Sequence, residues 1–152
     1  MNNSIIIILA GMMLMTALPT YVESSEDILG VWNNEEKDAK IEMYKCGVKY
    51  CGKIIWLKEP NYPEGSKDGV PGTPRLDHHN PDSSLRNVLI IGLNIVHDFT
   101  TTDGHTWFGG TVYDPKSGKT YRGKMTLVSP NQLNMRGYVG IPLFGRTTTW
   151  TK

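Results

Sequence analysis

The sequence predicts an all-β protein, and three observations lead to this prediction. Short runs rich in Val, Ile, Thr, Tyr and Trp recur along the chain between turns of Gly, Pro, Asp and Asn. After residue 24, no stretch shows a sustained helical period of apolar residues. The chain has 152 residues, of which 39% are hydrophobic and 20% charged, which suits one globular domain with an apolar core. We therefore expect a single β domain over residues 25–152.

The first 24 residues are expected to be a signal peptide. The apolar run from Ile5 to Met15 has the length of a signal-peptide core and is too short to span a bilayer. Small residues at 22–24 suit cleavage before Ser25. The segment before the apolar run has no Lys or Arg, which leaves an uncleaved anchor as the alternative. We expect export to the periplasm or out of the cell, with no transmembrane segment after processing.

Charge and cysteine content narrow the possible partners. The chain has 16 basic and 15 acidic residues, a net charge of +1, which disfavours nucleic acid as a partner. Cys46 and Cys51 are expected to lie opposite each other in a hairpin and, in an exported protein, to form a disulfide. Two cysteines without a nearby histidine make a poor zinc site, so no metal is expected.

Eight strands are predicted, with one long connection over residues 59–88. The strands cover roughly 28–34, 39–46, 51–58, 89–99, 105–113, 119–127, 132–140 and 144–151. Consecutive strands with one apolar face tend to close, because closure removes exposed edges and encloses the apolar face. We expect an antiparallel up-and-down barrel of about eight strands, which can be filled by side chains or hold one small ligand.

Hairpin registers predict which side chains point into this barrel. Side chains alternate between the two faces of a strand, so a correct pairing gathers apolar residues on one face. Pairing the end residues of 46–51, 114–119 and 140–143 satisfies this test. The predicted interior wall consists of Ile41, Met43, Ile54, Trp56, Phe108, Val112, Tyr121, Met125 and Met135.

Three glycines are also predicted to point inward: Gly110, Gly123 and Gly137. Each lacks a side chain where a packed core would have one, so together they could leave room for a ligand. Alternatively, they relieve strain where strands bend at barrel corners.

The first and last strands resemble those of the lipocalins. The chain carries Gly30-x-Trp32 on its first strand, and the register places Arg146 and Trp150 on the inner face of the last. In lipocalins, a Gly-x-Trp packs at the closed end of the barrel beneath an arginine or lysine. The resemblance implies that Gly30, Trp32 and Trp150 form the closed end. Arg146 either covers Trp32 or binds the carboxylate or phosphate head group of a ligand.

A second resemblance covers nearly the whole chain after residue 25. The motifs resemble those of the exported bacterial family called domain of unknown function 2147, and they occur at Gly30-Val31-Trp32, Cys51-Gly52-Lys53-Ile54, Asn80-Pro81-Asp82, Leu85-Arg86, Gly92-Leu93, Trp107-Phe108-Gly109-Gly110, Tyr113-Asp114-Pro115, Gly118-Lys119-Thr120-Tyr121, Arg136-Gly137-Tyr138, Gly145-Arg146-Thr147 and Trp150. One departure lies at 88–90, where a proline would be expected. The resemblance implies export and a lipocalin-like barrel, but no activity.

The long connection carries Asp77-His78-His79-Asn80-Pro81-Asp82. Adjacent histidines on an extended segment point to opposite sides, which disfavours a shared metal. We expect Asn80 and Asp82 to bond nearby backbone or to cap a short helix at 83–86. A connection this long is unusual on a compact barrel, and such connections are often lids or binding elements.

An enzyme would need a placed nucleophile or an acid–base pair. The plausible titrating residues are Asp77, Asp82, His97, Asp98 and His105, and none sits in a known catalytic motif. The sequence has no Gly-x-Ser-x-Gly, phosphate loop or His-Glu-x-x-His. We therefore expect no catalytic residue and no cofactor.

The favoured hypothesis is an exported barrel that binds a small hydrophobic or amphiphilic ligand, such as a fatty acid, without turnover. Methionines suit its wall because they adapt to irregular ligands. One alternative is a structural or protein-binding envelope module, for which Ile55 and Leu57 on the outer face would supply a patch. A hydrolase acting on envelope or secreted substrates is the less favoured alternative.

Overall fold

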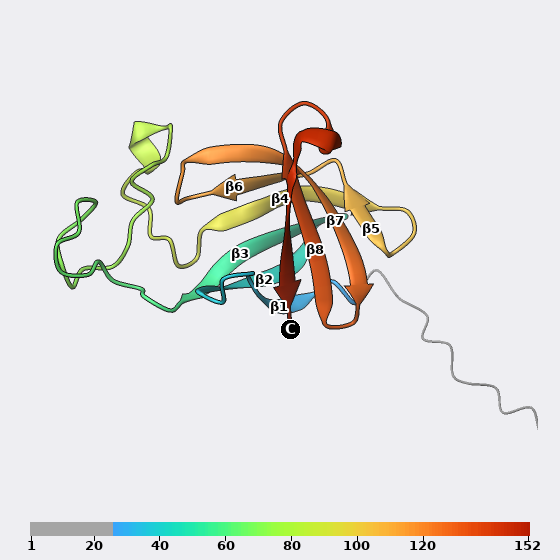
Figure 1. Ribbon diagram of the computed structural model, residues 1–152, viewed down its shortest axis with the longest axis horizontal. Helices are drawn as coiled ribbons and strands as arrows, with labels where there is room; N and C mark the ends of the chain where they lie inside the picture. Colours follow the sequence, from blue (N-terminus) through green and yellow to red (C-terminus); the bar gives the residue numbers. More distant parts are fainter. Residues whose placement is uncertain (1–25) are drawn as a thin grey trace, which may run out of the picture.

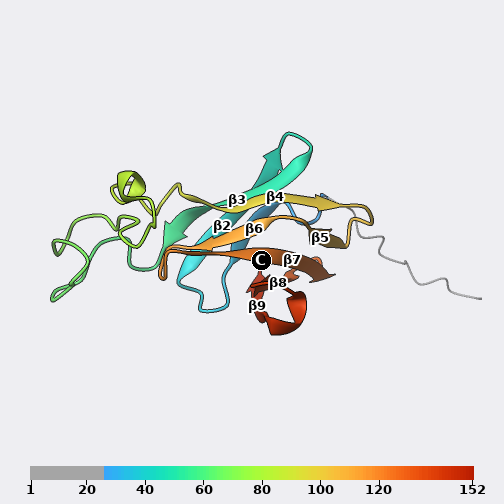
Figure 2. The ribbon, with the colours of Figure 1, turned by 90° about the horizontal axis from the view of Figure 1, so that it is seen from above.

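The computed structural model describes residues 26–152 and shows a closed antiparallel β-barrel (Figures 1 and 2). The predicted signal peptide lies outside the described residues. The strands are β1 Gly30–Asn33, β2 Ala39–Cys46, β3 Lys49–Leu57, β4 Asn94–Thr101, β5 Thr106–Phe108, β6 Thr111–Asp114, β7 Lys119–Ser129, β8 Gln132–Tyr138 and β9 Arg146–Thr151. Two single-turn 3₁₀ helices lie in the connections, η1 at Ser83–Leu85 and η2 at Pro142–Phe144.

Eight strand positions go around the barrel, as the sequence predicts. Apart from β5 and β6, strands that follow each other in the sequence pair with each other, and β1 closes against β9. The short strands β5 and β6 share one position, because both pair with β4 on one side and β7 on the other. The prediction of an all-β antiparallel barrel of about eight strands is confirmed.

The break between β5 and β6 changes which residues face inward. The sequence predicts one strand over 105–113, with Phe108 inside. In the structure, Gly109 has a positive φ of 79° and the strand is interrupted there. The interruption shifts the alternation by one residue, so Trp107 is fully buried and Phe108 is 43% exposed. The inward prediction for Phe108 is therefore wrong.

The β2–β3 hairpin also departs from the predicted register. Cys46 pairs with Lys49, and Cys51 with Tyr44, so the two cysteines lie diagonally rather than opposite each other. A shift of two residues keeps the side chains of this part of the hairpin on their predicted faces, and the predicted disulfide forms. A bulge farther along the hairpin places Trp56 opposite Lys40, with 41% of its surface exposed. Trp56 therefore faces outward, and the prediction that it faces inward is wrong.

The other two predicted hairpin registers are confirmed. Asp114 pairs with Lys119 in β6–β7, and Leu133 pairs with Trp150 in β8–β9. Clear alternation of apolar and polar residues specifies these registers, because a slip of one residue would expose the apolar set.

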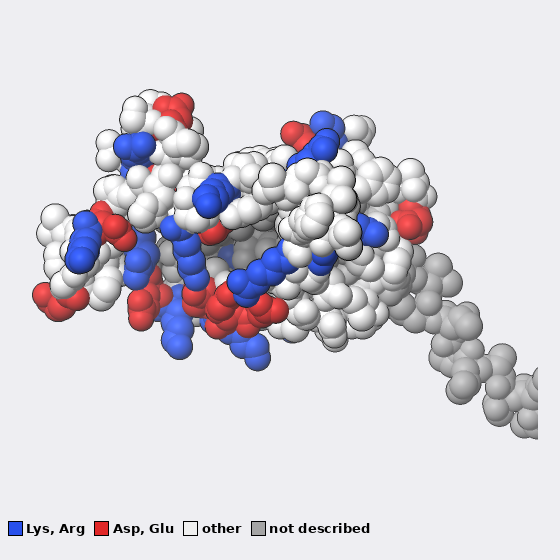
Figure 3. Space-filling view, turned by 45° about the horizontal axis from the view of Figure 1, so that its top comes forward, with Lys and Arg blue, Asp and Glu red and all other residues white. Residues whose placement is uncertain are grey.

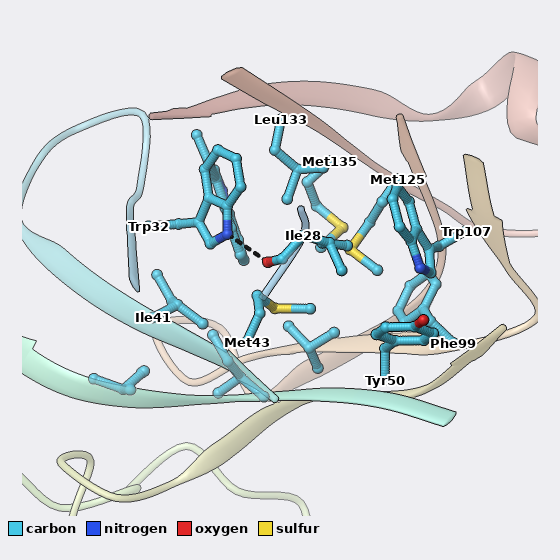
Figure 4. Close-up of a cluster of buried hydrophobic side chains, with 14 of the residues drawn as sticks. Ile28, Trp32, Ile41, Met43, Tyr50, Phe99, Trp107, Met125, Leu133 and Met135 are labelled. Atoms are coloured by element: carbon cyan, nitrogen blue, oxygen red, sulfur yellow. Dashed lines mark hydrogen bonds between the residues drawn. The ribbon is translucent and has the colours of Figure 1, made fainter. Parts of the chain in front are cut away.

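One half of the barrel interior is solidly packed (Figure 4). The fully buried side chains there include Trp32, Met43, Val96, Phe99, Trp107, Met125, Leu127 and Leu133. The Trp32 indole N–H donates to the Ile28 carbonyl oxygen at 2.8 Å, which ties β1 to the turn that precedes it. Burial of a large apolar side chain contributes about 1.5–3 kcal/mol, so this half carries much of the stability of the fold.

Two of the inward glycines make room for Phe99 rather than for a ligand. A Cβ built on Gly110 or Gly123 would lie 2.3 Å from the Phe99 ring. The ring therefore fills the space that both glycines leave. A Cβ on Gly137 would come only to 3.4 Å from Tyr121, which is ordinary contact. The expectation of open space is thus wrong for Gly110 and Gly123.

Candidate functional site

An open cavity of about 1010 Å³ extends from the other half of the barrel interior to the long β3–β4 connection and the turns beside it. Its inner wall is apolar and consists of Ala39, Ile41, Ile54, Ile90, Ile95, Val112, Met135 and Trp150, together with the rings of Tyr113 and Tyr121. Four connections surround its mouth: β1–β2, the long β3–β4 connection, β6–β7 and β8–β9. In Figure 3 this end appears as a hollow ringed by charged side chains.

The predicted wall residues fall into three groups. Ile41, Ile54, Val112, Tyr121 and Met135 line the cavity. Met43 and Met125 are at most 1% exposed and belong to the packed half, outside the cavity lining. Trp56 and Phe108 lie on the outside of the barrel.

Two of the residues predicted for the closed end, Trp32 and Trp150, belong to the same cluster of buried side chains. Gly30 and Trp32 begin β1 next to the packed half, and Trp150 also lines the cavity. The Lys152 Nζ lies 4.6 Å from the centre of the Trp32 ring and donates to the Asp27 carbonyl oxygen at 2.7 Å. The prediction that Arg146 covers Trp32 is wrong. Lys152, just after the end of β9, covers Trp32 instead, and the resemblance to lipocalins allows a lysine at this place.

Arg146 lies at the mouth, where its guanidinium is 3.5 Å from Glu35 Oε2. The other carboxylate oxygen of Glu35 accepts a hydrogen bond from the Thr149 backbone N–H at 3.2 Å. This link supports the closure of the barrel, because β1 and β9 otherwise share the single residue pair Asn33–Thr151. Glu35 therefore continues the β1–β9 seam beyond the end of β1.

An ion pair crosses the mouth from one side to the other. Lys116 Nζ, in the β6–β7 turn, donates to Asp38 Oδ2, in the β1–β2 turn, at 2.8 Å. Four strand positions separate these turns in either direction around the barrel. Asn34 Nδ2 also donates to Asp38, at 2.6 Å. Both residues of the bridge line the cavity.

The pair shifts the pKa values of both groups. Burial alone would raise the pKa of Asp38, but the hydrogen bonds from Lys116 and Asn34 lower it below its ordinary value. The hydrogen bond with Asp38 raises the pKa of Lys116, against the effect of burial. Both groups are therefore charged throughout the neutral range.

A buried carboxylate holds the long β3–β4 connection against the barrel. Asp77 is fully buried, and it accepts hydrogen bonds from the Tyr113 hydroxyl at 2.6 Å and from Asn80 Nδ2 at 2.7 Å. Burial, with the neighbouring Asp77 carboxylate, raises the pKa of the Tyr113 hydroxyl. Tyr113 therefore stays a neutral donor, and this contact fixes one side of the mouth.

The turn chemistry predicted after Asn80 is confirmed. The Asn80 side-chain oxygen accepts from the Asp82 backbone N–H at 2.9 Å. Asp82 caps η1 by accepting from the Ser84 backbone N–H, also at 2.9 Å. These side chains satisfy backbone donors, and the hydrogen bond from Ser84 keeps the pKa of Asp82 low.

The remaining titrating candidates lie in separate places. On β4, His97 is near the Asn94 carbonyl oxygen at 3.1 Å, and Asp98 pairs with Lys49 at 3.2 Å. His105 lies in the β4–β5 hairpin, whereas Asp77 is buried beneath the long connection. Within residues 26–152, no three His, Cys, Asp or Glu side chains are grouped to hold a metal ion.

The proposed outer-face patch is smaller than expected. Ile55 and Leu57 are both half-buried, and Leu57 packs against the core and lines the cavity. The bulge that turns Trp56 outward also turns Leu57 inward. In the part of the chain that the structure describes, no helix is long and apolar enough to span a membrane.

Sequence reasoning missed Phe99, Tyr113, Lys116 and Asp38. A pair of inward glycines opposite one aromatic residue could have identified Phe99. Lys116 and Asp38 carry no such signal, because each is an ordinary polar residue in a turn and 78 positions separate them.

Comparison with known proteins agrees with this fold. Residues 30–152 match the model of a family described as uncharacterized proteins conserved in bacteria (DUF2147). A solved structure of a Helicobacter pylori protein, described as belonging to the lipocalin family, is similar with a TM-score of 0.67. The match covers 82% of each chain at 22% sequence identity, which supports the fold alone. No curated protein sequence matches the chain significantly.

Proposed function

The chain belongs to the DUF2147 family of bacterial proteins, and we propose that it binds one small hydrophobic or amphiphilic ligand inside its barrel, without chemical turnover. The observation that carries this proposal is the open cavity of about 1010 Å³ with an apolar wall. Ligand sites in proteins typically measure about 300–1,000 Å³ and combine apolar walls with a few polar groups. The cavity has both features.

The distribution of polarity favours an amphiphile such as a fatty acid. The depth of the cavity is formed by Ile41, Ile54 and Met135, whereas the mouth carries Lys116 and Arg146. A hydrocarbon chain in the depth would be removed from water, and a carboxylate or phosphate head group would remain at the mouth. In this arrangement Arg146 is a head-group contact rather than a cover over Trp32.

The disulfide fits the proposed location. Cys46 and Cys51 are bonded, and disulfides persist in oxidising compartments. We place the protein in the periplasm or outside the cell, where a barrel with an apolar site in its interior could carry a poorly soluble molecule through water.

Uptake of a fluorescent fatty acid, with cavity-filling variants, tests the proposal. Val112→Trp and Thr148→Trp add bulk to residues that line the cavity from different strands. Val128→Trp is the matched control, since Val128 is 48% exposed and lies outside the cavity lining. We expect both cavity variants to lose uptake while the control retains it. Equal uptake by all three folded variants would refute interior binding.

A further inference from the structure

The connection between β8 and β9 exposes an unusual amount of apolar surface. Over six residues, Val139 is 70% exposed, Ile141 53%, Leu143 75% and Phe144 77%. Figure 1 shows this connection, with η2 at its tip, standing clear of the barrel. Single exposed apolar side chains are normal, but a contiguous group of large ones marks an interaction site.

The connection is held in a fixed shape by Arg136. Its guanidinium donates to the carbonyl oxygens of Pro142 at 2.7 Å and Leu143 at 3.2 Å, and to the Thr147 hydroxyl at 2.9 Å. The Gly145 backbone N–H also donates to the Pro142 carbonyl at 3.1 Å. Backbone groups that are already bonded can enter an apolar medium at a much lower cost than unpaired ones.

The same connection is continuous with the cavity. Val139 and Phe144 both line the mouth, so an apolar path leads from the exposed tip to the inner wall. An exposed cation follows it in the sequence: the Arg146 side chain, which pairs with Glu35, is 79% exposed. This arrangement suits contact with acyl chains at the tip and phosphate groups at its base.

We propose that residues 139–144 insert into the interfacial region of a phospholipid bilayer and bring the cavity mouth to the lipid surface. A stable protein interface needs about 20–30 residues on each side, whereas this tip offers four large apolar side chains. Shallow burial of such side chains, aided by neighbouring cations, is how interfacial segments hold a membrane. The proposal goes beyond interior ligand binding, and the two can fail separately.

Site-specific labels on the full chain test this insertion. Both native cysteines are in the disulfide, so a cysteine introduced as Leu143→Cys can carry an environment-sensitive fluorophore alone. Val48→Cys is the matched control, because Val48 is 93% exposed in the β2–β3 turn at the other end of the barrel. A local readout is needed because the apolar leader could itself retain the chain on vesicles.

With vesicles of phosphatidylcholine and phosphatidylglycerol, we expect a blue shift and quenching by nitroxide-labelled lipids for the label at 143. The label at 48 should show neither effect. An unchanged emission at 143 would overturn the proposal, as would equal quenching at both positions.

A double variant provides the second measurement. Ile141→Asp combined with Leu143→Asp alters only exposed side chains outside the cavity lining, so the melting temperature should stay near that of the parent chain. With a label at Val139→Cys as the readout, vesicle affinity of the tip should fall about tenfold or more, and Val48→Asp should leave it unchanged. Fatty-acid uptake without vesicles should persist in the double variant. Self-association in solution that the two aspartates abolish would instead identify a second copy of the chain as the occupant.

Discussion

Lys116 Nζ and Asp38 Oδ2 lie 2.8 Å apart and connect two turns on opposite sides of the barrel mouth. The pair stands above an apolar cavity that would otherwise be open between these turns. Both side chains are partly exposed, so the bridge can break and re-form without unfolding. We therefore expect it to act on how fast a ligand enters and leaves more than on the stability of the protein.

Removing the bridge should speed ligand exchange. In Lys116→Met, uptake and release of a fluorescent fatty acid should both become faster in stopped-flow measurements. Exposed ion pairs contribute at most about 1 kcal/mol, so the free energy of unfolding should change little. Lys53→Met is the control, because Lys53 pairs with Glu42 at 3.2 Å, outside the cavity lining. Identical exchange rates in the two variants would contradict a role for the bridge.

The bridge also predicts a pH dependence of ligand release. The pKa of Asp38 is lowered from 3.8 in the folded protein, so its stabilising contact is fully present above that value and is lost as the pH falls through the lowered pKa. The pKa of Lys116 is raised from 10.5, so the contact is lost on the alkaline side only as the pH rises through the raised value. Release should be constant across neutral pH and should accelerate below about pH 4.

Asp38→Asn tests this assignment, since the amide does not titrate. The acid acceleration should be absent in this variant, provided that circular dichroism shows a folded barrel at each pH. An acceleration in the parent chain that is already complete at neutral pH would contradict the assignment to Asp38.

Two glycine substitutions should differ sharply in their effect on stability. In Gly123→Ala the new Cβ would lie 2.3 Å from the fully buried Phe99 ring, so the ring or the strand must move. We expect a loss of about 1–3 kcal/mol, the usual cost of overpacking. In Gly137→Ala the nearest atom is 3.4 Å away, so the free energy of unfolding should be nearly unchanged. Chemical denaturation measures both, and equal losses would show that Phe99 is not the cause.

The disulfide should contribute modestly to stability. It closes a loop between residues only five positions apart, and on the loop-entropy model so short a loop stabilises by about 2 kcal/mol. Cys46→Ser should therefore lower the melting temperature while leaving the barrel folded. Alkylation before and after reduction reports the bond directly, and free thiols in the native protein would contradict it.

The barrel and two of its hairpins are predictable from sequence because local alternation specifies them. The pairings of Asp114 with Lys119 and of Leu133 with Trp150 follow from which register buries apolar side chains. Sequence reasoning fails for Trp56 and Phe108, because a bulge and a strand break each shift the alternation by one residue.

The site is less predictable than the fold. Five wall residues from the sequence do line the cavity, but periodicity along one strand cannot show how deep in the barrel a residue lies. Met43 and Met125 point inward and still belong to the packed half. The shape of the cavity mouth depends on contacts between segments that are distant in the sequence, such as Asp77 with Tyr113. No local sequence pattern predicts such contacts.

Native mass spectrometry of the protein purified from its own cells tests the central claim most directly. The account predicts a population whose mass exceeds that of the bare chain by one small amphiphile, and the excess should disappear after delipidation. The delipidated protein should then take up a fatty acid in a one-to-one complex. A bare mass from native material, together with no complex after adding fatty acids or phospholipids, would contradict interior ligand binding.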